Sequence, residues 1–167
     1  GIVKWAGAFY QVEHNNGVVS TFCNISGSNS AYKRIDYFQK KDDSQYVSTD
    51  WKWIRGFTIK SGANFNLDDY NNVFFNMGHI SKAPKFSNIY TQSNTLQAYI
   101  NNEEVKAIEG GYSFRSSSFS VNINTYYTVW KNKPANISEN IGNIMYSDVV
   151  PMNALHKGLE LDWAYKF

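Results

Sequence analysis

The chain has 167 residues, of which 18% are charged and 17% aromatic, and its formal net charge is +2. This length is typical of one domain, over residues 1–167, with enough chain for a core. The near-neutral charge gives no indication of nucleic-acid binding, and no apolar run reaches the roughly 18 residues of a membrane-spanning helix, so we expect no transmembrane segment. The abundance of Tyr, Phe, Trp, Asn and Ser favours strands and predicts an all-β, mainly antiparallel fold.

The first half of the chain contains a hairpin signal and a separate strand. Trp5–Val12 and Val18–Cys23 are strand-like runs on either side of Asn16-Gly17, and both residues of that pair tolerate positive φ. Trp51–Ile59 reads as the next strand. The polar stretch Ser61–Asn72 predicts a long loop, with a helical turn near its middle.

The second half contains the longest alternating run. Thr95–Ile100 and Glu103–Ile108 predict a second hairpin, which the Gly110-Gly111 pair should end. In Ser117–Trp130 the apolar side chains fall on every second residue, which indicates a strand of about 45 Å with one apolar face. So long a strand should bend or carry a bulge. The polar residues 133–143 predict a loop.

The last segment predicts a short helix and a terminal strand. Pro151–Lys157 has Pro in a first-turn position and apolar residues at helical spacing. From Leu159 to Phe167 hydrophobic residues again alternate with polar ones. Two such apolar faces need a covering layer, so we expect a compact, two-layer sheet or sandwich with one helix near 151–157.

Residues that could perform catalysis do not form recognised patterns. Cys23 is the only cysteine, which excludes a disulfide within the chain, and we expect it to be packed. His14, His79 and His156 are too far apart in sequence to give a metal-ligand spacing. The sequence predicts no catalytic residues, no metal site and no cofactor, so we expect that the protein is not an enzyme.

Aromatic residues mixed with Asn, Ser and Arg on strand faces suit carbohydrate binding. Sugars present apolar C–H patches and hydroxyl groups, which aromatic rings and amide or guanidinium donors complement. For any one of these residues, a place in the core or on plain surface is the simpler interpretation. The candidate glycan-binding residues are Arg34, Trp53, Arg55, Tyr99, Tyr112, Arg115, Tyr126 and Trp130.

Several segments, taken in order, resemble the head of the rotavirus outer-capsid spike protein, its amino-terminal trypsin fragment. They are Phe9–Val19, Asp50–Ser61, Leu96–Gly110, Ser118–Trp130 and Val149–Leu155. The resemblance implies a virion-surface attachment domain, made in the host cytoplasm, that binds a host cell-surface glycan or glycoprotein receptor and joins the remainder of the spike. It also implies a galectin-like sandwich, although the spacing between Gly17 and Trp51 departs from the familiar heads and allows a different strand order.

Two further functions compete with this prediction. A secreted bacterial adhesin or carbohydrate-binding module would share the same surface chemistry. A small β-fold hydrolase would instead bring carboxylates or the three histidines together. The sequence alone names neither the glycan nor the position of its pocket.

Overall fold

A computed structural model describes residues 1–42, 45–91, 93–141 and 144–167. Seven of its strands form one antiparallel sheet in the order β1-β2-β5-β6-β7-β8-β9, and each strand pairs with its neighbours along the chain apart from the excursion between β2 and β5. This confirms the predicted all-β, antiparallel class. The strands are β1 (Ile2–Asn15), β2 (Val19–Lys33), β5 (Lys52–Asn66), β6 (Asn71–Lys82), β7 (Glu103–Arg115), β8 (Phe119–Ile141) and β9 (Ile144–Tyr165).

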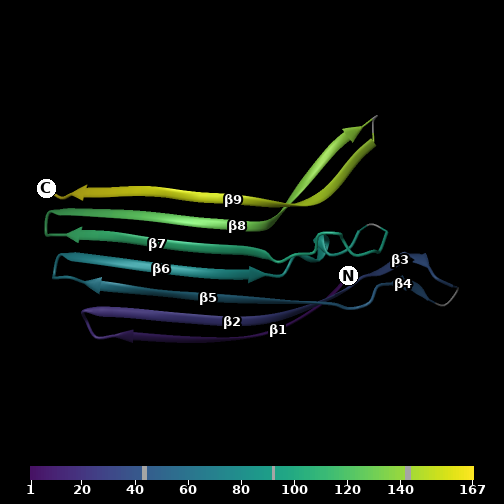
Figure 1. The fold of residues 1–167 in the computed structure, drawn as a ribbon, viewed down its shortest axis with the longest axis horizontal. Helices are drawn as coiled ribbons and strands as arrows, with labels where there is room; N and C mark the ends of the chain where they lie inside the picture. The colour runs from purple at the N-terminus through teal and green to yellow at the C-terminus, as the bar shows by residue number, and fades with distance from the viewer. Residues whose placement is uncertain (43–44, 92, 142–143) are drawn as a thin grey trace.

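The two ends of the sheet differ in their connections (Figure 1). At one end, tight turns join β1 to β2, β5 to β6 and β7 to β8. At the other end lie the longer excursions, which hold a small sheet of β3 (Ile35–Lys40) and β4 (Tyr46–Ser48) and the 3-10 helix η1 (Phe86–Asn88). We call these the turn end and the loop end.

The strands are staggered regularly at the turn end. The last pair of the first hairpin, Asn15–Ser20, is in register with Asn64. The β5–β6 hairpin extends two residues beyond that row, to Asn66. The β7–β8 hairpin extends two residues beyond the end of the β5–β6 hairpin, to Arg115. A stagger of two residues for every two strands corresponds to a strand tilt of about 35° if the turns lie at one level.

The sheet is a single layer, and this corrects the two-layer expectation. The chain exposes 12192 Å² of surface, whereas a globular monomer of its 19.1 kDa mass would expose about 8,400 Å². The described hydrophobic core is a small cluster at the loop end, built on Tyr32, Ile89 and Tyr90. Most hydrophobic side chains of the seven strands therefore have no protein layer over them.

Four local predictions are wrong in the same direction, because each replaced strand with loop or helix. Residues 151–157 belong to β9, so the predicted helix is absent; its backbone pairs with β8. Of the predicted loop over 61–72, residues 61–66 belong to β5 and residues 71–72 to β6, which leaves a tight turn at 67–70. Gly110-Gly111 lies inside β7, and the described residues of 133–143 belong to β8.

The predicted hairpin over 95–108 is half right. Glu103–Ile108 forms part of β7, but in the segment before it only an isolated bridge joins Tyr90 to Leu96. The long strand is confirmed, and so is its irregularity. The β8–β9 register shifts between Trp130 and Lys133, where Asn132 has φ 55°, and the outer part of this hairpin bends away from the sheet in Figure 1.

Candidate functional site

The register of the ladder defines two chemically different faces. Paired residues on neighbouring strands project to the same side of a sheet, so one residue assigns the face of its whole row. The row through Tyr127 contains Val12, Cys23, Ser61, Met77, Ile108 and Lys157. Its neighbouring row through Tyr126 contains Glu13, Phe22, Gly62, Asn76, Glu109 and Gly158.

The first of these sides, which we call the apolar face, crosses all seven strands. Leu159 and Trp163 on β9 are 72% and 68% exposed, and Met77 in the middle of the sheet is 54% exposed. Isolated exposed hydrophobic residues are common, but a contiguous surface of this kind marks contact with another apolar medium or partner. Its further members include Tyr10, Ile25, Ile59, Phe75, Ile123, Val129, Leu155 and Leu161.

Aromatic rings gather on the apolar face near the turn end. The ring centroids of Phe114 and Phe119 are 6.4 Å apart, and those of Tyr70 and Phe114 are 6.5 Å apart. Tyr165, which pairs with Phe119 across the β8–β9 ladder, continues this group. An aromatic band beside a row of short turns gives this end of the sheet a different chemistry from the loop end.

The opposite side, which we call the polar face, carries amide and carboxylate groups linked between strands. The Oε1 atom of Glu109 accepts a hydrogen bond from Asn124 Nδ2 at 2.9 Å, and its Oε2 atom accepts one from Asn76 Nδ2 at 3.4 Å. Ser113 Oγ donates to Asn122 at 2.8 Å. These bonds join β6, β7 and β8 through polar side chains. The face also carries aromatic rings, among them Trp5 and Phe9 on β1.

Aromatic rings on the polar face lie over glycines of the neighbouring strand. A Cβ at Gly158 would be 2.6 Å from Tyr126 Oη, and one at Gly62 would be 2.5 Å from Phe22 Cε1. Phe74 occupies the same space above Gly111. In each case the ring and the glycine are direct partners in the ladder, so the missing side chain makes room for the ring.

The loop between β6 and β7 packs against the polar face at the loop end. Tyr90 Oη donates to the carbonyl oxygens of Tyr32 at 2.8 Å and Asp50 at 3.2 Å, and Tyr32 Oη donates to Pro84 at 2.9 Å. Ile54, on the same side of the sheet as Tyr32, packs against this cluster. The loop therefore covers one corner of the polar face.

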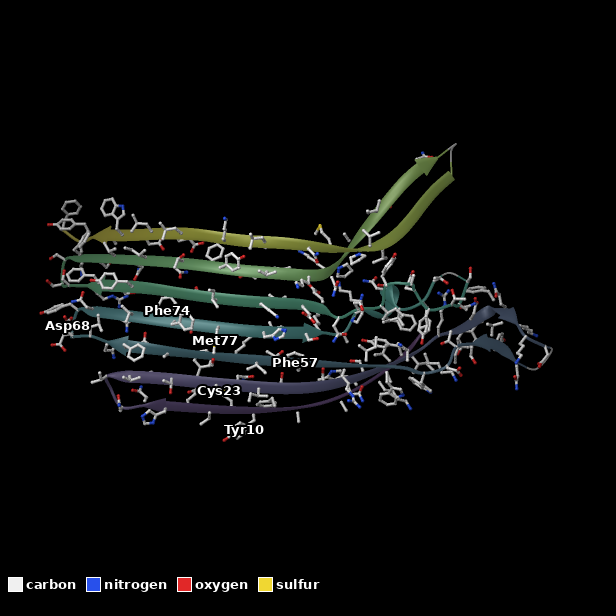
Figure 2. The ribbon with its side chains drawn as sticks, viewed as in Figure 1. Tyr10, Cys23, Phe57, Asp68, Phe74 and Met77 are labelled. Carbon is white, nitrogen blue, oxygen red and sulfur yellow. The ribbon has the colours of Figure 1, made fainter. Side chains whose placement is uncertain are left out.

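Two carboxyl groups at the ends of the sheet have lowered pKa values. The side-chain amide of Asn94 and the backbone N–H of Phe38 hold the pKa of Asp36 below 3.8. At the turn between β5 and β6, the N–H of Tyr70 and the side chain of Asn71 lower the pKa of Asp68, which is labelled in Figure 2, below 3.8. Both groups fix loops or turns at the ends of the sheet.

The predicted glycan-binding residues fall into three separate places. Trp53, Arg55 and Tyr112 lie on the apolar face, and Tyr112 donates its hydroxyl to Asn71. Arg115, Tyr126 and Trp130 lie on the polar face.

The remaining two candidates, Arg34 and Tyr99, lie in the loops. The Nη1 atom of Arg34 donates to the Thr91 carbonyl at 2.7 Å, so its guanidinium ties two loops together. Near the same end, Lys133 Nζ lies 4.8 Å from the Trp130 ring centroid.

The structure does not bring the eight candidates into one pocket. Sequence reasoning did not anticipate the Glu109 network, because its three members lie on three strands.

No protein-family model matches the sequence, and no curated protein matches it significantly. Among solved structures, the chain is similar to one described as "Copper transporter OprC", with a TM-score of 0.78. The likeness is one of fold. Sequence identity is 14%, and the match covers 98% of this chain but 27% of that one, so this chain spans about a quarter of the transporter's length.

None of the helices in the described ranges is long and apolar enough to cross a membrane. In the same part of the chain, no three His, Cys, Asp or Glu side chains come together as metal ligands would.

Proposed function

We propose that the seven-stranded sheet is a section of the wall of an outer-membrane transport barrel. Its apolar face contacts lipid, and its polar face lines an aqueous interior. The main support for this proposal is the contiguous, exposed apolar face of the sheet, which lies opposite the hydrogen-bonded polar face. In a bilayer that apolar surface is covered by acyl chains, while the paired strands satisfy their backbone groups internally.

The dimensions of the apolar face support this proposal. On β8 the face runs from Phe119 to Val129, which is about 33 Å along the strand. Because the strands tilt by about 35°, this span projects to about 27 Å along the axis of the proposed barrel, which is the membrane normal. The apolar band of transmembrane barrels is about 25 Å tall. The sheet therefore matches the thickness of a bilayer core without further adjustment.

The two ends of the sheet suggest its orientation. Outer-membrane barrels have short turns on the periplasmic side and longer loops outside, with aromatic residues at the membrane boundaries. Here the turn end carries the aromatic group around Phe114, and the loop end carries the excursions with β3, β4 and η1. The loop end accordingly faces outward and the turn end inward.

Closure of the wall requires more strands than the sheet contains. Within the described residues β1 and β9 are the edge strands of the sheet, and an open edge in lipid would leave backbone groups without partners. Further strands complete the barrel in this proposal. The transport role in this proposal rests on the similarity of fold to a structure that is named as a copper transporter. For this chain we propose a polar solute as the transported molecule.

Spin labelling of β9 tests the proposal. In a Cys23→Ser background, single cysteines at Leu159, Glu160, Leu161 and Asp162 carry the label in protein reconstituted into vesicles. We expect dissolved oxygen, which concentrates in lipid, to relax the labels at 159 and 161. A water-soluble nickel chelate should relax those at 160 and 162. Equal accessibility at all four positions would reject a lipid-facing sheet.

The sequence-based alternative, a non-enzymatic viral attachment head that binds host glycans, stays a prediction. Trp53 and Trp130, two of its candidate residues, lie on opposite faces of the sheet, so they would serve different sites. An attachment head would remain folded in water without lipid or detergent. Glycan binding by such a soluble form would favour that function over a membrane wall. The present proposal also departs from the expectation that no segment crosses a membrane.

A further inference from the structure

The Lys and Arg side chains on the apolar face are confined to its loop half in the described pairing. Lys4, Arg55, Lys106 and Lys157 occupy this half, on β1, β5, β7 and β9. Between them and the turn end, the strand positions of this face carry no Lys, Arg, Asp or Glu in the described pairing. We propose that this basic level binds the phosphate groups of anionic lipids and that a hollow beside Lys106 holds an acyl chain; the inference rests on the membrane wall proposed above.

The height of the basic level fits the boundary of a bilayer. Lys106 is nine residues from Arg115, the last residue of β7 at the turn end. At about 2.7 Å of height per tilted residue, it lies about 24 Å above that end. This is the far boundary of an apolar band of about 25 Å, where lipid phosphates lie. A lysine at this depth extends its ammonium toward the headgroups while its methylene stem stays in the apolar layer.

A hollow lies directly beneath this level, between β5 and β8. Its volume is about 520 Å³. Lys106 and His79, which are direct cross-strand partners, line its loop side. Apolar side chains form most of the remainder, including Ile59, Met77, Ile108, Tyr127 and Val129. A cation at the upper rim and an open apolar depression below it match a phosphate headgroup followed by its acyl chain.

The polar groups at the rim leave positive charge available to a phosphate. The Nε2 atom of His79 is buried and has no hydrogen-bond partner among the described residues, while the ring packs edge-on against Phe57 with centroids 5.0 Å apart. Glu104 lies on the same face, and its ladder partner on β8 is the basic residue Lys131. The excess of basic residues favours an anionic lipid over a zwitterionic one.

Lys60 provides a matched control. It lies on β5 and pairs with Gly78, which places it one residue from the row of Lys106 and on the polar face. Its side chain has the same charge and is also exposed. Loss of a positive charge at Lys60 should leave lipid selection unchanged, because that side chain faces the aqueous interior in this proposal.

Native mass spectrometry of protein from mixed vesicles tests the inference. The vesicles contain equal amounts of phosphatidylglycerol and phosphatidylcholine with identical acyl chains. We expect the wild-type protein to retain the anionic lipid preferentially, Lys106→Gln to lower that preference by about fivefold, and Lys60→Gln to leave it unchanged. An unchanged preference in Lys106→Gln, or an equal loss in Lys60→Gln, would overturn the inference.

A second readout separates this inference from the proposed function. Quenching of Trp163 fluorescence by brominated phosphatidylcholine, measured as the difference from Trp163→Phe, reports whether the apolar face contacts lipid. Quenching without anionic selectivity overturns the phosphate site alone. Absence of quenching in the wild-type protein overturns the membrane wall and, with it, the lipid site.

Discussion

Individual residues at the ends of the sheet fix its turns through short hydrogen bonds. Asp68 is the clearest case, since its Oδ1 atom accepts from the backbone N–H groups of Tyr70 at 2.8 Å and Asn71 at 2.7 Å. The side-chain amide of Asn71 donates to the same carboxylate. An Asx-type turn of this kind closes β5 onto β6 with few residues. The sequence showed these polar residues, but their pairing in a tight turn was hidden by the loop-like composition around them.

The carboxyl of Asp68 should titrate below its usual pH range. Its folded pKa is lowered from 3.8, first by the Tyr70 N–H and then by the Asn71 side chain. Its contribution to stability is therefore present above the unfolded pKa of 3.8 and is lost as pH falls through the lower folded value. Carboxyl ¹³C NMR should give a midpoint below 3.8, and Asn71→Ala should move that midpoint upward.

A midpoint for Asp68 at or above 3.8 would contradict the turn geometry. Asp68→Asn serves as the control for assignment, because it removes the titrating group while keeping an oxygen acceptor for the Tyr70 N–H.

Among the elements, the turn-end parts of β8 and β9 were predictable from alternation, whereas the full extent of these and the other strands was not. Strict period-two patterns in Phe119–Val129 and from Leu159 onward identified the faces correctly. The segment from Pro151 to Lys157 has helical spacing, but its backbone pairs with β8, and this tertiary context overrides the local preference. Asn- and Gly-rich stretches read as loops because polar residues on one face of a strand dilute the hydrophobic signal.

The pairing of rings with glycines across strands gives an element-scale prediction. A Cβ at Gly111 would collide with the Phe74 ring and would lie 2.8 Å from the Ile123 carbonyl oxygen. We expect Gly111→Ala to destabilise the protein by about 1–3 kcal/mol, as overpacking does elsewhere. The midpoint of urea unfolding in detergent micelles, followed by tryptophan fluorescence, measures this cost.

Gly27→Ala is the matched control for Gly111→Ala. Gly27 also lies inside a strand, but a Cβ there would meet no atom within 4 Å. Its replacement should leave stability unchanged or raise it slightly, because alanine reduces the freedom of the unfolded chain. Equal effects of the two substitutions would show that the close ring contact does not constrain the ladder.

At the scale of the whole molecule, the missing second layer is the main difference between sequence and structure. The alternating hydrophobic residues predict a covering layer, and the sandwich expectation assigns that cover to a second sheet. In the structure the strands form one sheet whose apolar face stays exposed over seven strands. The period-two pattern is the same for a sandwich and for a wall in lipid, so alternation could not distinguish them.

The candidate binding residues also could not be located without the ladder register. Trp53 and Tyr112 fall on one face and Tyr126 and Trp130 on the other, and this assignment depends on which residue of each strand opposes the next. A shift of one residue would exchange the faces of a whole strand. Composition correctly indicated many aromatic residues on strands but not which of them meet a partner.

Quenching by brominated lipid of two single-tryptophan proteins tests the membrane wall most directly. In each protein the other tryptophans are replaced by Phe, leaving either Trp163 on the apolar face or Trp130 on the polar face. After reconstitution into vesicles, the account predicts strong quenching of Trp163 and little quenching of Trp130. Equal quenching of the two, or quenching of Trp130 alone, would contradict it.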